Sequence, residues 1–317
     1  YPGGVLPVAN AGTRFSAPVI GIMDYPVLNY AILVTSALTP DPTGVGSRET
    51  TTIAGDSESM TIATIDVNGL GGTDAEAAFT AFAAEIVNRL NSPDVVSIDT
   101  AFDNSGIAND GTTAADQTFA RLIAAVTAAG GPSYAYVQID PVDGLDGGDL
   151  GGNARIGYLY NAARIGYSGT AGDASAATSV SCTDGVPGLT LNPGRIDPGN
   201  AAFDGNRKVL AAQFDFAGVP FFVIGISFVD NSQDSPFFGA VQPPLLVSQA
   251  RRVEQAQIVH DFAASILACD ASARVVILGN VNDDPGTLPQ TTLAGTQFES
   301  MSNVLAANSR QSVVVDG

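Results

Sequence analysis

Short β-rich segments that run into polar turns recur along this chain, and they constrain its fold more than any other feature. Four of them lie at residues 61–70, 93–106, 223–234 and 275–283. Short apolar runs bounded by turn residues are typical of buried strands, and helical patterns separate several of these runs. Strands that alternate with helices, together with strands that adjoin in sequence, predict a mixed α/β core.

Three stretches have the apolar periodicity of helices. The first begins at Thr73, the expected N-cap, and extends to about residue 90. The second covers residues 117–129, with Asp116 as its expected N-cap. The third covers residues 248–267 and is long and amphipathic.

The charge balance argues against nucleic acid as a partner. The chain has 32 acidic and 13 basic residues, which give a formal net charge of −19. Nucleic-acid binding depends on cationic groups that displace counterions from phosphates, so duplex nucleic acid is a poor partner for this chain. The sequence also lacks an apolar run near the roughly 18 residues of a membrane span, so no span is expected.

The composition favours an exported protein. The chain begins Tyr1-Pro2-Gly3-Gly4, without an initiator methionine or a visible signal peptide, which indicates processing or truncation. Low Lys content, the absence of Trp, and abundant Gly, Ala, Ser, Thr and Asp are typical of secreted bacterial surface proteins. We therefore expect an extracellular or cell-surface location.

The chain has two cysteines, Cys182 and Cys269, and one histidine, His260. An even cysteine count in an exported protein permits one disulfide, and the alternative is two unrelated buried thiols. Cys182 lies in a Ser/Thr/Gly-rich segment and not in a core-like strand, which favours the disulfide. So few Cys and His residues exclude the usual zinc site, and His260 is interpreted as a surface or packing residue of the third helix.

An acidic, glycine-rich stretch at residues 143–153 has two interpretations. Gly and Asp are typical of flexible surface turns. Clustered carboxylates and carbonyls are also ligands for hard cations, so Asp143, Asp146 and Asp149 are candidate calcium ligands. Their spacing differs from that of the helix-loop-helix calcium motif.

The first 50 residues differ from the rest of the chain. They are rich in Pro and Gly and contain short apolar runs at residues 17–23 and 30–35 that are typical of strands. Residues 38–59 have the Pro, Thr, Gly and Ser content of a linker. The sequence thus predicts a β-rich N-terminal segment and linker over residues 1–50 and a larger domain over residues 51–317.

Six motifs, in order between residues 58 and 317, carry a resemblance to a known family. They are Ser92-Pro93-Asp94-Val95-Val96, Asp103-Asn104-Ser105-Gly106, Gly151-Gly152-Asn153-Ala154-Arg155-Ile156-Gly157-Tyr158-Leu159-Tyr160-Asn161, Asn192-Pro193-Gly194-Arg195-Ile196-Asp197-Pro198, Phe238-Gly239-Ala240-Val241-Gln242-Pro243-Pro244 and Leu278-Gly279-Asn280-Val281-Asn282-Asp283. On these motifs the chain resembles the endonuclease/exonuclease/phosphatase family, and in particular the domain of large secreted bacterial nucleases. The resemblance implies the deoxyribonuclease-like four-layer fold, a two-sheet β-sandwich flanked by helices.

The family cleaves phosphodiesters with a carboxylate-bound, magnesium-like ion and His residues, and most matching positions are substituted in this chain. The resemblance matches Asp66 to an Asn that orients the metal ligands, and Thr100 to the metal-binding Glu. It matches Ser227 to a His and Asn280 to the general-base Asp. Because side chains alternate along a strand, Asp99 is expected to face away from the position of Thr100.

Four residues with substrate-positioning roles in the family are retained: Arg155, Tyr160, Arg207 and Asn282. For the two arginines, ordinary salt bridges are the alternative interpretation. The family's C-terminal Asp-His pair has no match, and residues 312–317 resemble the strand that precedes it.

Catalytic groups act as a unit, so several replacements leave little catalysis. The sequence therefore predicts a secreted, catalytically degenerate nuclease-like protein. It would act as a binding or structural, self-assembling module, with itself or cell-surface components as partners. A polymer in which the N-terminal segment docks onto a neighbouring copy is a further interpretation.

The alternative is an active, metal-dependent extracellular nuclease or phosphodiesterase. In that case Asp66, Asp99, Asp283 and Asp284 would rebuild a site for Mg²⁺ or Ca²⁺. Convergence of two of these carboxylates on one cation position is the geometric feature that this alternative requires.

Overall fold

The computed structural model describes residues 13–28, 30–41, 50–236, 238–283 and 285–301. The chain divides into two compact units, one with residues 50–231 and 249–298 and the other with residues 1–49, 232–248 and 299–317. Several sequence-based expectations lie outside the described residues: the chain start, part of the linker, Asp284 and the strand at residues 312–317. The domain boundary at residue 50 stays a prediction, and the smaller unit adds residues 232–248 to the N-terminal segment.

The smaller unit contains two short antiparallel ribbons. β1 (Arg14–Phe15) pairs with β4 (Pro40–Asp41), and β2 (Gly21–Asp24) pairs with β3 (Ala31–Val34). The two apolar runs predicted as strands in this segment thus form the β2–β3 ribbon, in shortened form.

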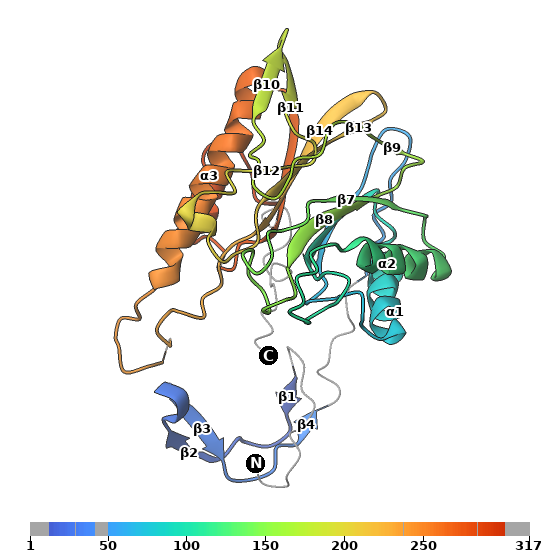
Figure 1. Cartoon of the computed structure of the whole chain (residues 1–317). Coiled ribbons are helices and arrows are strands. Elements are labelled where there is room, and N and C mark those ends of the chain that lie inside the picture. Colours follow the sequence, from blue (N-terminus) through green and yellow to red (C-terminus); the bar gives the residue numbers. More distant parts are fainter. Residues whose placement is uncertain (1–12, 29, 42–49, 237, 284, 302–317) are drawn as a thin grey trace. The chain divides into compact units, whose positions relative to one another are not determined.

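The larger unit contains two large β-sheets with the helices that cover them, and a separate two-stranded antiparallel ribbon of β10 and β11 (Figure 1). The first sheet has the strand order β5-β6-β8-β7, and the second has the order β12-β13-β14-β15 with β9 beside β13. Its strands are β5 (Ile62–Asp66), β6 (Val95–Ala101), β7 (Ala135–Gln138), β8 (Arg155–Tyr160), β9 (Ile165–Tyr167), β10 (Val180–Thr183), β11 (Val186–Leu189), β12 (Gly194–Arg195), β13 (Leu210–Phe216), β14 (Val219–Ser227) and β15 (Arg274–Asn280). Its helices include α1 (Glu76–Ala84), α2 (Asp116–Ala128), α3 (Val247–Cys269) and α4 (Leu288–Ala294).

Alternating apolar side chains form three packed layers. Ile98 and Phe119 belong to the layer between the first sheet and helices α1 and α2. Tyr158 and Phe214 belong to the layer between the two sheets, and Val259 belongs to the layer between the second sheet and α3. The predicted four-layer sandwich is therefore confirmed, with helices on both outer faces (Figure 1).

A buried tyrosine joins the two sheets at their centre. Tyr158, on β8, donates its hydroxyl proton to the Leu210 carbonyl and accepts a hydrogen bond from the Gly225 N–H, each at 2.6 Å. Position 225 has to be glycine, because a Cβ atom there would lie 2.8 Å from this hydroxyl. Burial raises the pKa of the Tyr158 phenol, so it stays a neutral donor.

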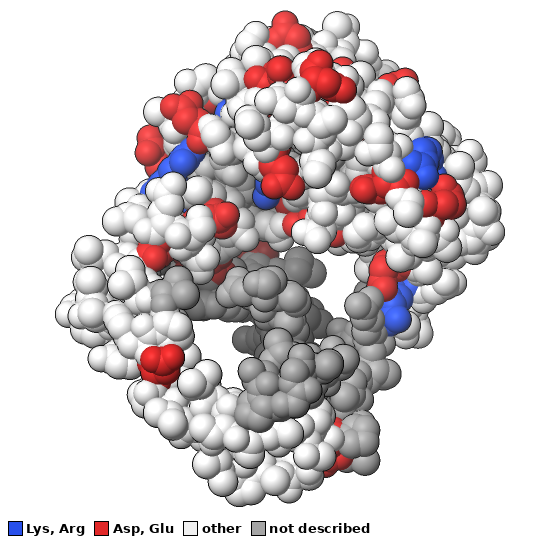
Figure 2. All heavy atoms as spheres, turned by 60° about the horizontal axis from the view of Figure 1, so that its bottom comes forward, with Lys and Arg blue, Asp and Glu red and all other residues white. Residues whose placement is uncertain are grey.

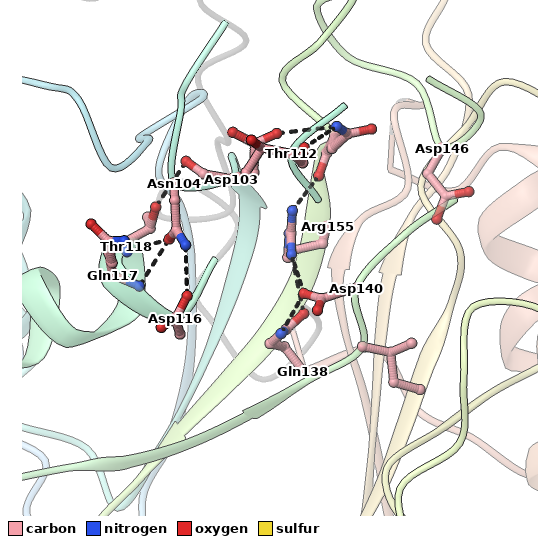
Figure 3. Close-up of polar contacts among 12 residues, drawn as sticks. Asp103, Asn104, Thr112, Asp116, Gln117, Thr118, Gln138, Asp140, Asp146 and Arg155 are labelled. Carbon is pink, nitrogen blue, oxygen red and sulfur yellow. Dashed lines mark hydrogen bonds and ion pairs between the residues drawn. The ribbon is translucent and has the colours of Figure 1, made fainter. Parts of the chain in front are cut away.

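Two predicted N-cap residues are wrong. Helix α2 is capped by Asn104, whose Oδ1 accepts from the two backbone N–H groups that follow Asp116, at 2.8 and 3.3 Å (Figure 3). The predicted cap Asp116 instead accepts a 2.6 Å hydrogen bond from Asn104 Nδ2. Helix α1 begins at Glu76 and not at Thr73, whose hydroxyl donates to a backbone carbonyl of another loop.

Cys182 and Cys269 form a disulfide between β10 and the last residue of α3. The bond closes a loop with a sequence separation of 87 residues. In the chain-entropy model, this loop lowers the conformational entropy of the unfolded chain and stabilises the fold by roughly 4–5 kcal/mol. None of the helices in the described ranges has the length and apolar character needed to cross a membrane.

Replacing Tyr158 with Phe should lower the free energy of unfolding by about 1–3 kcal/mol, because Leu210 O and Gly225 N would lose a buried partner. Tyr160→Phe is the matched control on the same strand and should change stability by less than about 0.5 kcal/mol. Urea unfolding of the wild type and both variants measures the difference. Equal losses in the two variants would contradict the bridging role of the Tyr158 hydroxyl.

Candidate functional site

Four polar residues end the two parallel strand pairs. β5 and β6 are parallel and pair Asp66 with Asp99, while β14 and β15 are parallel and pair Ser227 with Asn280. In each of these strands every second side chain faces the space between the sheets, and the polar residue is the last member of that inward-facing series. These series contain Ile62, Val95, Val223 and Leu278. The four polar side chains therefore meet at one rim of the sandwich.

The Asn280 amide links the two sheets at this rim. Its Nδ2 donates to Asp66 Oδ2 at 3.0 Å and to Asp99 Oδ2 at 2.8 Å. Two carboxylates of the first sheet thus converge on a single nitrogen of the second sheet. This amide stands where a cation shared by the two carboxylates would have to lie.

Arg207 holds the other oxygen of Asp99. Its Nε lies 3.2 Å from Asp99 Oδ1 and donates to Ser227 Oγ at 2.9 Å. Asp99 is only 1% exposed, and burial raises the pKa of its carboxyl against the opposing effect of Arg207. Of the two interpretations of Arg207, the structure therefore places it in an ion pair within the candidate site.

The expectation that Asp99 faces away from the site is wrong. The β6–β8 register shifts between Ile98 and Ala101, so Asp99 and Thr100 occupy a bulge. Thr100 has φ 56°, and its hydroxyl is buried without a hydrogen-bond partner among the described residues. The alternation that starts at Val95 was the signal in the sequence for the inward position of Asp99.

Arg155 lies apart from these carboxylates. Its Nη1 is 2.7 Å from Asp140 Oδ1, and its Nη2 donates to the Asn153 carbonyl at 3.0 Å (Figure 3). Burial lowers the pKa of Arg155 to about 10, although Asp140 opposes the effect. The Arg155 guanidinium is buried and Asp140 is exposed, so this ion pair joins a buried charge to a carboxylate at the surface.

Tyr160 and Asn282 also differ from their expected roles. Tyr160 pairs with Val95 at the first residue of β6, so it lies at the opposite end of that strand from Asp99. Asn282 follows β15 at the rim, and its Nδ2 donates to the Phe228 carbonyl at 2.6 Å. The contact fixes the turn after β15 and uses one of the two amide hydrogens of Asn282 internally.

The acidic loop is anchored and its central carboxylate is already paired. Asp146 is 2% exposed and lies 2.6 Å from Arg195 Nη1 and 3.8 Å from Lys208 Nζ. Asp143 accepts a 3.1 Å hydrogen bond from Asn153 Nδ2. Asp146 is therefore held in a buried ion pair and is not available as a calcium ligand in this arrangement, while residues 143–145 and 148–150 form exposed turns.

The rim does not fit a divalent cation as its side chains are arranged. Mg²⁺ takes oxygen ligands at about 2.0–2.1 Å in near-octahedral geometry. The shared position is held by Asn280 Nδ2, Asp99 is paired with Arg207, and Asp283 is paired with Arg252 at 2.9 Å. Within the described part of the chain, no three His, Cys, Asp or Glu residues group together.

Comparison with known proteins returns structures and no sequence relatives. No family model and no curated protein matches the chain. A humanized D. rerio TDP2 structure is 14% identical, with TM-score 0.40, over 77% of this chain and 68% of that chain. A beta toxin of Staphylococcus aureus with a deleted β-hairpin is 15% identical, with TM-score 0.40, over 75% and 74%. The human Nocturnin catalytic domain with bound sulfate is 12% identical, with TM-score 0.47, over 80% and 75%.

The two stacked sheets between helical layers are the arrangement that the resemblance to the endonuclease/exonuclease/phosphatase family implies.

Wild-type stability should fall relative to that of Asp99→Asn as pH rises from about 4. The pKa of Asp99 is raised above 3.8 in the folded protein, so in this window the folded state binds more protons than the unfolded state. Urea midpoints of both proteins, compared across the acidic and neutral range, measure the change. A stability difference that is independent of pH would contradict the raised pKa of Asp99.

Replacing Asn280 with Asp should make stability depend on divalent cations. The variant places a third carboxylate between Asp66 and Asp99, which should cost about 1–3 kcal/mol in the presence of a chelator. Mg²⁺ or Ca²⁺ should restore part of this loss in a thermal unfolding assay. Asn280→Ala is the control without added charge and should show no such gain. An equal cation-dependent gain in the wild type would indicate that the metal site is intact.

Proposed function

We propose that this chain is a catalytically degenerate nuclease-like protein that acts outside the cell as a binding or structural module and assembles with itself. The observation that carries the proposal is the double hydrogen bond from Asn280 to Asp66 and Asp99. In the family resemblance this position belongs to a general base. Here a neutral amide donates its protons to the carboxylates and offers none of the basicity that the reaction needs.

Ser227 supports the same proposal. It matches a His position in the family, and its hydroxyl accepts a hydrogen bond from Arg207. A serine hydroxyl does not exchange protons near neutral pH as an imidazole does. The chain's one His, His260, contacts the Leu293 carbonyl and the Phe298 ring, away from the polar rim residues.

The disulfide and the charge support an extracellular role with few anionic partners. Disulfides persist in oxidising compartments, and Cys182–Cys269 is such a bond. Figure 2 shows red acidic atoms spread over the face in view and only sparse blue basic atoms. This distribution disfavours a phosphate backbone as the ligand.

A phosphodiesterase assay tests the proposal. Purified full chain is incubated with a chromogenic phosphodiester and with supercoiled DNA in Mg²⁺, Mn²⁺ or Ca²⁺, with and without chelator. The proposal predicts no chelator-sensitive turnover above the buffer rate. Turnover that chelator abolishes, and that Asp66→Asn and Asn282→Ala both remove, would overturn it, because contaminating enzymes would not respond to these substitutions.

An active metal-dependent phosphodiesterase is the second candidate, and one observation favours it. Asp66 Oδ2 and Asp99 Oδ2 approach the same point, as the alternative requires. The Asn280 amide would have to turn away and Arg207 would have to release Asp99 before both could bind a cation. The same assay decides between the candidates.

A further inference from the structure

The β2–β3 ribbon presents apolar side chains to solvent. Ile22, Met23, Ile32 and Leu33 are each more than half exposed. The Tyr25 hydroxyl and the Tyr30 N–H bond to backbone groups of residues 240 and 238, so a second exposed apolar segment lies beside the ribbon. The exposed members of that segment are Phe238, Val241, Leu245, Leu246 and Val247. Apolar surface of this extent is typical of an interaction site.

The ribbon is also nearly uncharged. Asp24 is the one charged residue between positions 15 and 40, and residues 235–250 have none. Without Lys or Arg, these segments offer nothing to attract phosphates or anionic lipid headgroups. A two-stranded ribbon is also only marginally stable alone in water, and a third strand would stabilise it.

The larger unit has a sheet edge that fits such a strand. β7 is the last strand of the first sheet, and its described residues make no backbone hydrogen bond on the side away from β8. An open groove of about 840 Å³ runs beside it. Its lining residues are Ala120, Ile123, Ala124, Thr127 and Ala128 of α2, with residues 133–136. An unpaired edge beside an apolar groove is the arrangement that binds an added strand.

The acidic residues near β7 favour β3 over β2 as the added strand. Asp116 and Asp140 lie close enough to Tyr136 of β7 to raise the pKa of its phenol, after the larger effect of burial. β2 carries Asp24, which this acidic surrounding would repel, whereas β3 is Ala31-Ile32-Leu33-Val34. Both β3 and β7 are four residues long, so their lengths match.

We propose that β3 of one copy adds to the β7 edge of a second copy, with alternate β3 side chains in the groove beside α2. The contact joins two different surfaces, so it is head-to-tail and repeats from copy to copy. Because the copies each carry a charge of −19, salt should promote the assembly by screening their repulsion. This contact rests on the proposed function, and it specifies the partner and the two surfaces through which the chain would assemble with itself.

Sedimentation velocity of the full chain and two surface variants tests the proposal. Leu33→Lys places a charge on the ribbon and leaves the groove intact. Ala124→Arg places a charge in the groove and leaves the ribbon intact. Both positions are exposed, so the fold should be retained, which thermal unfolding checks. Wild type should form species larger than dimers, and each variant alone should be a single chain. An equal mixture of the variants should form dimers and nothing larger, because only one ribbon and one groove remain intact.

Val186→Lys is the matched control, an exposed apolar residue of another ribbon, and should assemble as the wild type does. A monomeric wild type, or a mixture of variants that stays monomeric, would overturn the proposal. So would normal assembly of Ala124→Arg combined with loss in Leu33→Lys, since the ribbons would then pair with each other. Binding of a monomeric wild type to phosphatidylcholine vesicles would assign the ribbon to lipid and also overturn it. If the chain assembles as predicted but also shows chelator-sensitive turnover, the proposed loss of catalysis is wrong and the proposed β3–β7 contact stands. The failure of one proposal can therefore be told from the failure of the other.

Discussion

The hydroxyl of Tyr158 sets how the two sheets face each other, and the rest of the larger unit depends on that spacing. It bonds to Leu210 and Gly225 of the second sheet from the middle of the first. With the centre fixed, the carboxyl ends of two parallel strand pairs lie at one rim. The contact from Asn280 to Asp66 and Asp99 is possible only because the sheets are held in this way.

The sequence predicts the layers better than the details of the site. Alternating apolar residues predict the main strands and helices, and the second and third predicted helices differ from α2 and α3 by at most two residues at either end. The cap of α2 was missed because Asn104 comes from a distant loop, and local signals point to Asp116. The predicted orientation of Asp99 is wrong because the family resemblance matches Thr100 to the metal-binding position, whereas the bulge and the alternation from Val95 decide which side chain faces inward.

Buried charge explains the remaining errors. Arg155 and Asp146 belong to motifs that suggest binding, yet each is itself buried and paired with a residue of opposite charge. A buried charge that loses its partner destabilises the fold strongly, so such pairs serve the structure first. No periodicity or spacing in the sequence distinguishes an enclosed ion pair from an exposed ligand set. The same principle supports the proposed loss of catalysis, because Asn280 and Arg207 already satisfy the carboxylates that a metal would need.

The central claim is that the rim carboxylates are held by protein groups and do not form a working cation site. Electron paramagnetic resonance of Mn²⁺ titrated into the full chain tests it most directly, because bound Mn²⁺ loses the sharp signal of the free ion. We predict that the free-ion signal rises in proportion to added Mn²⁺, with no stoichiometric binding at the rim. Binding of one Mn²⁺ per chain that Asp66→Asn abolishes would contradict the account.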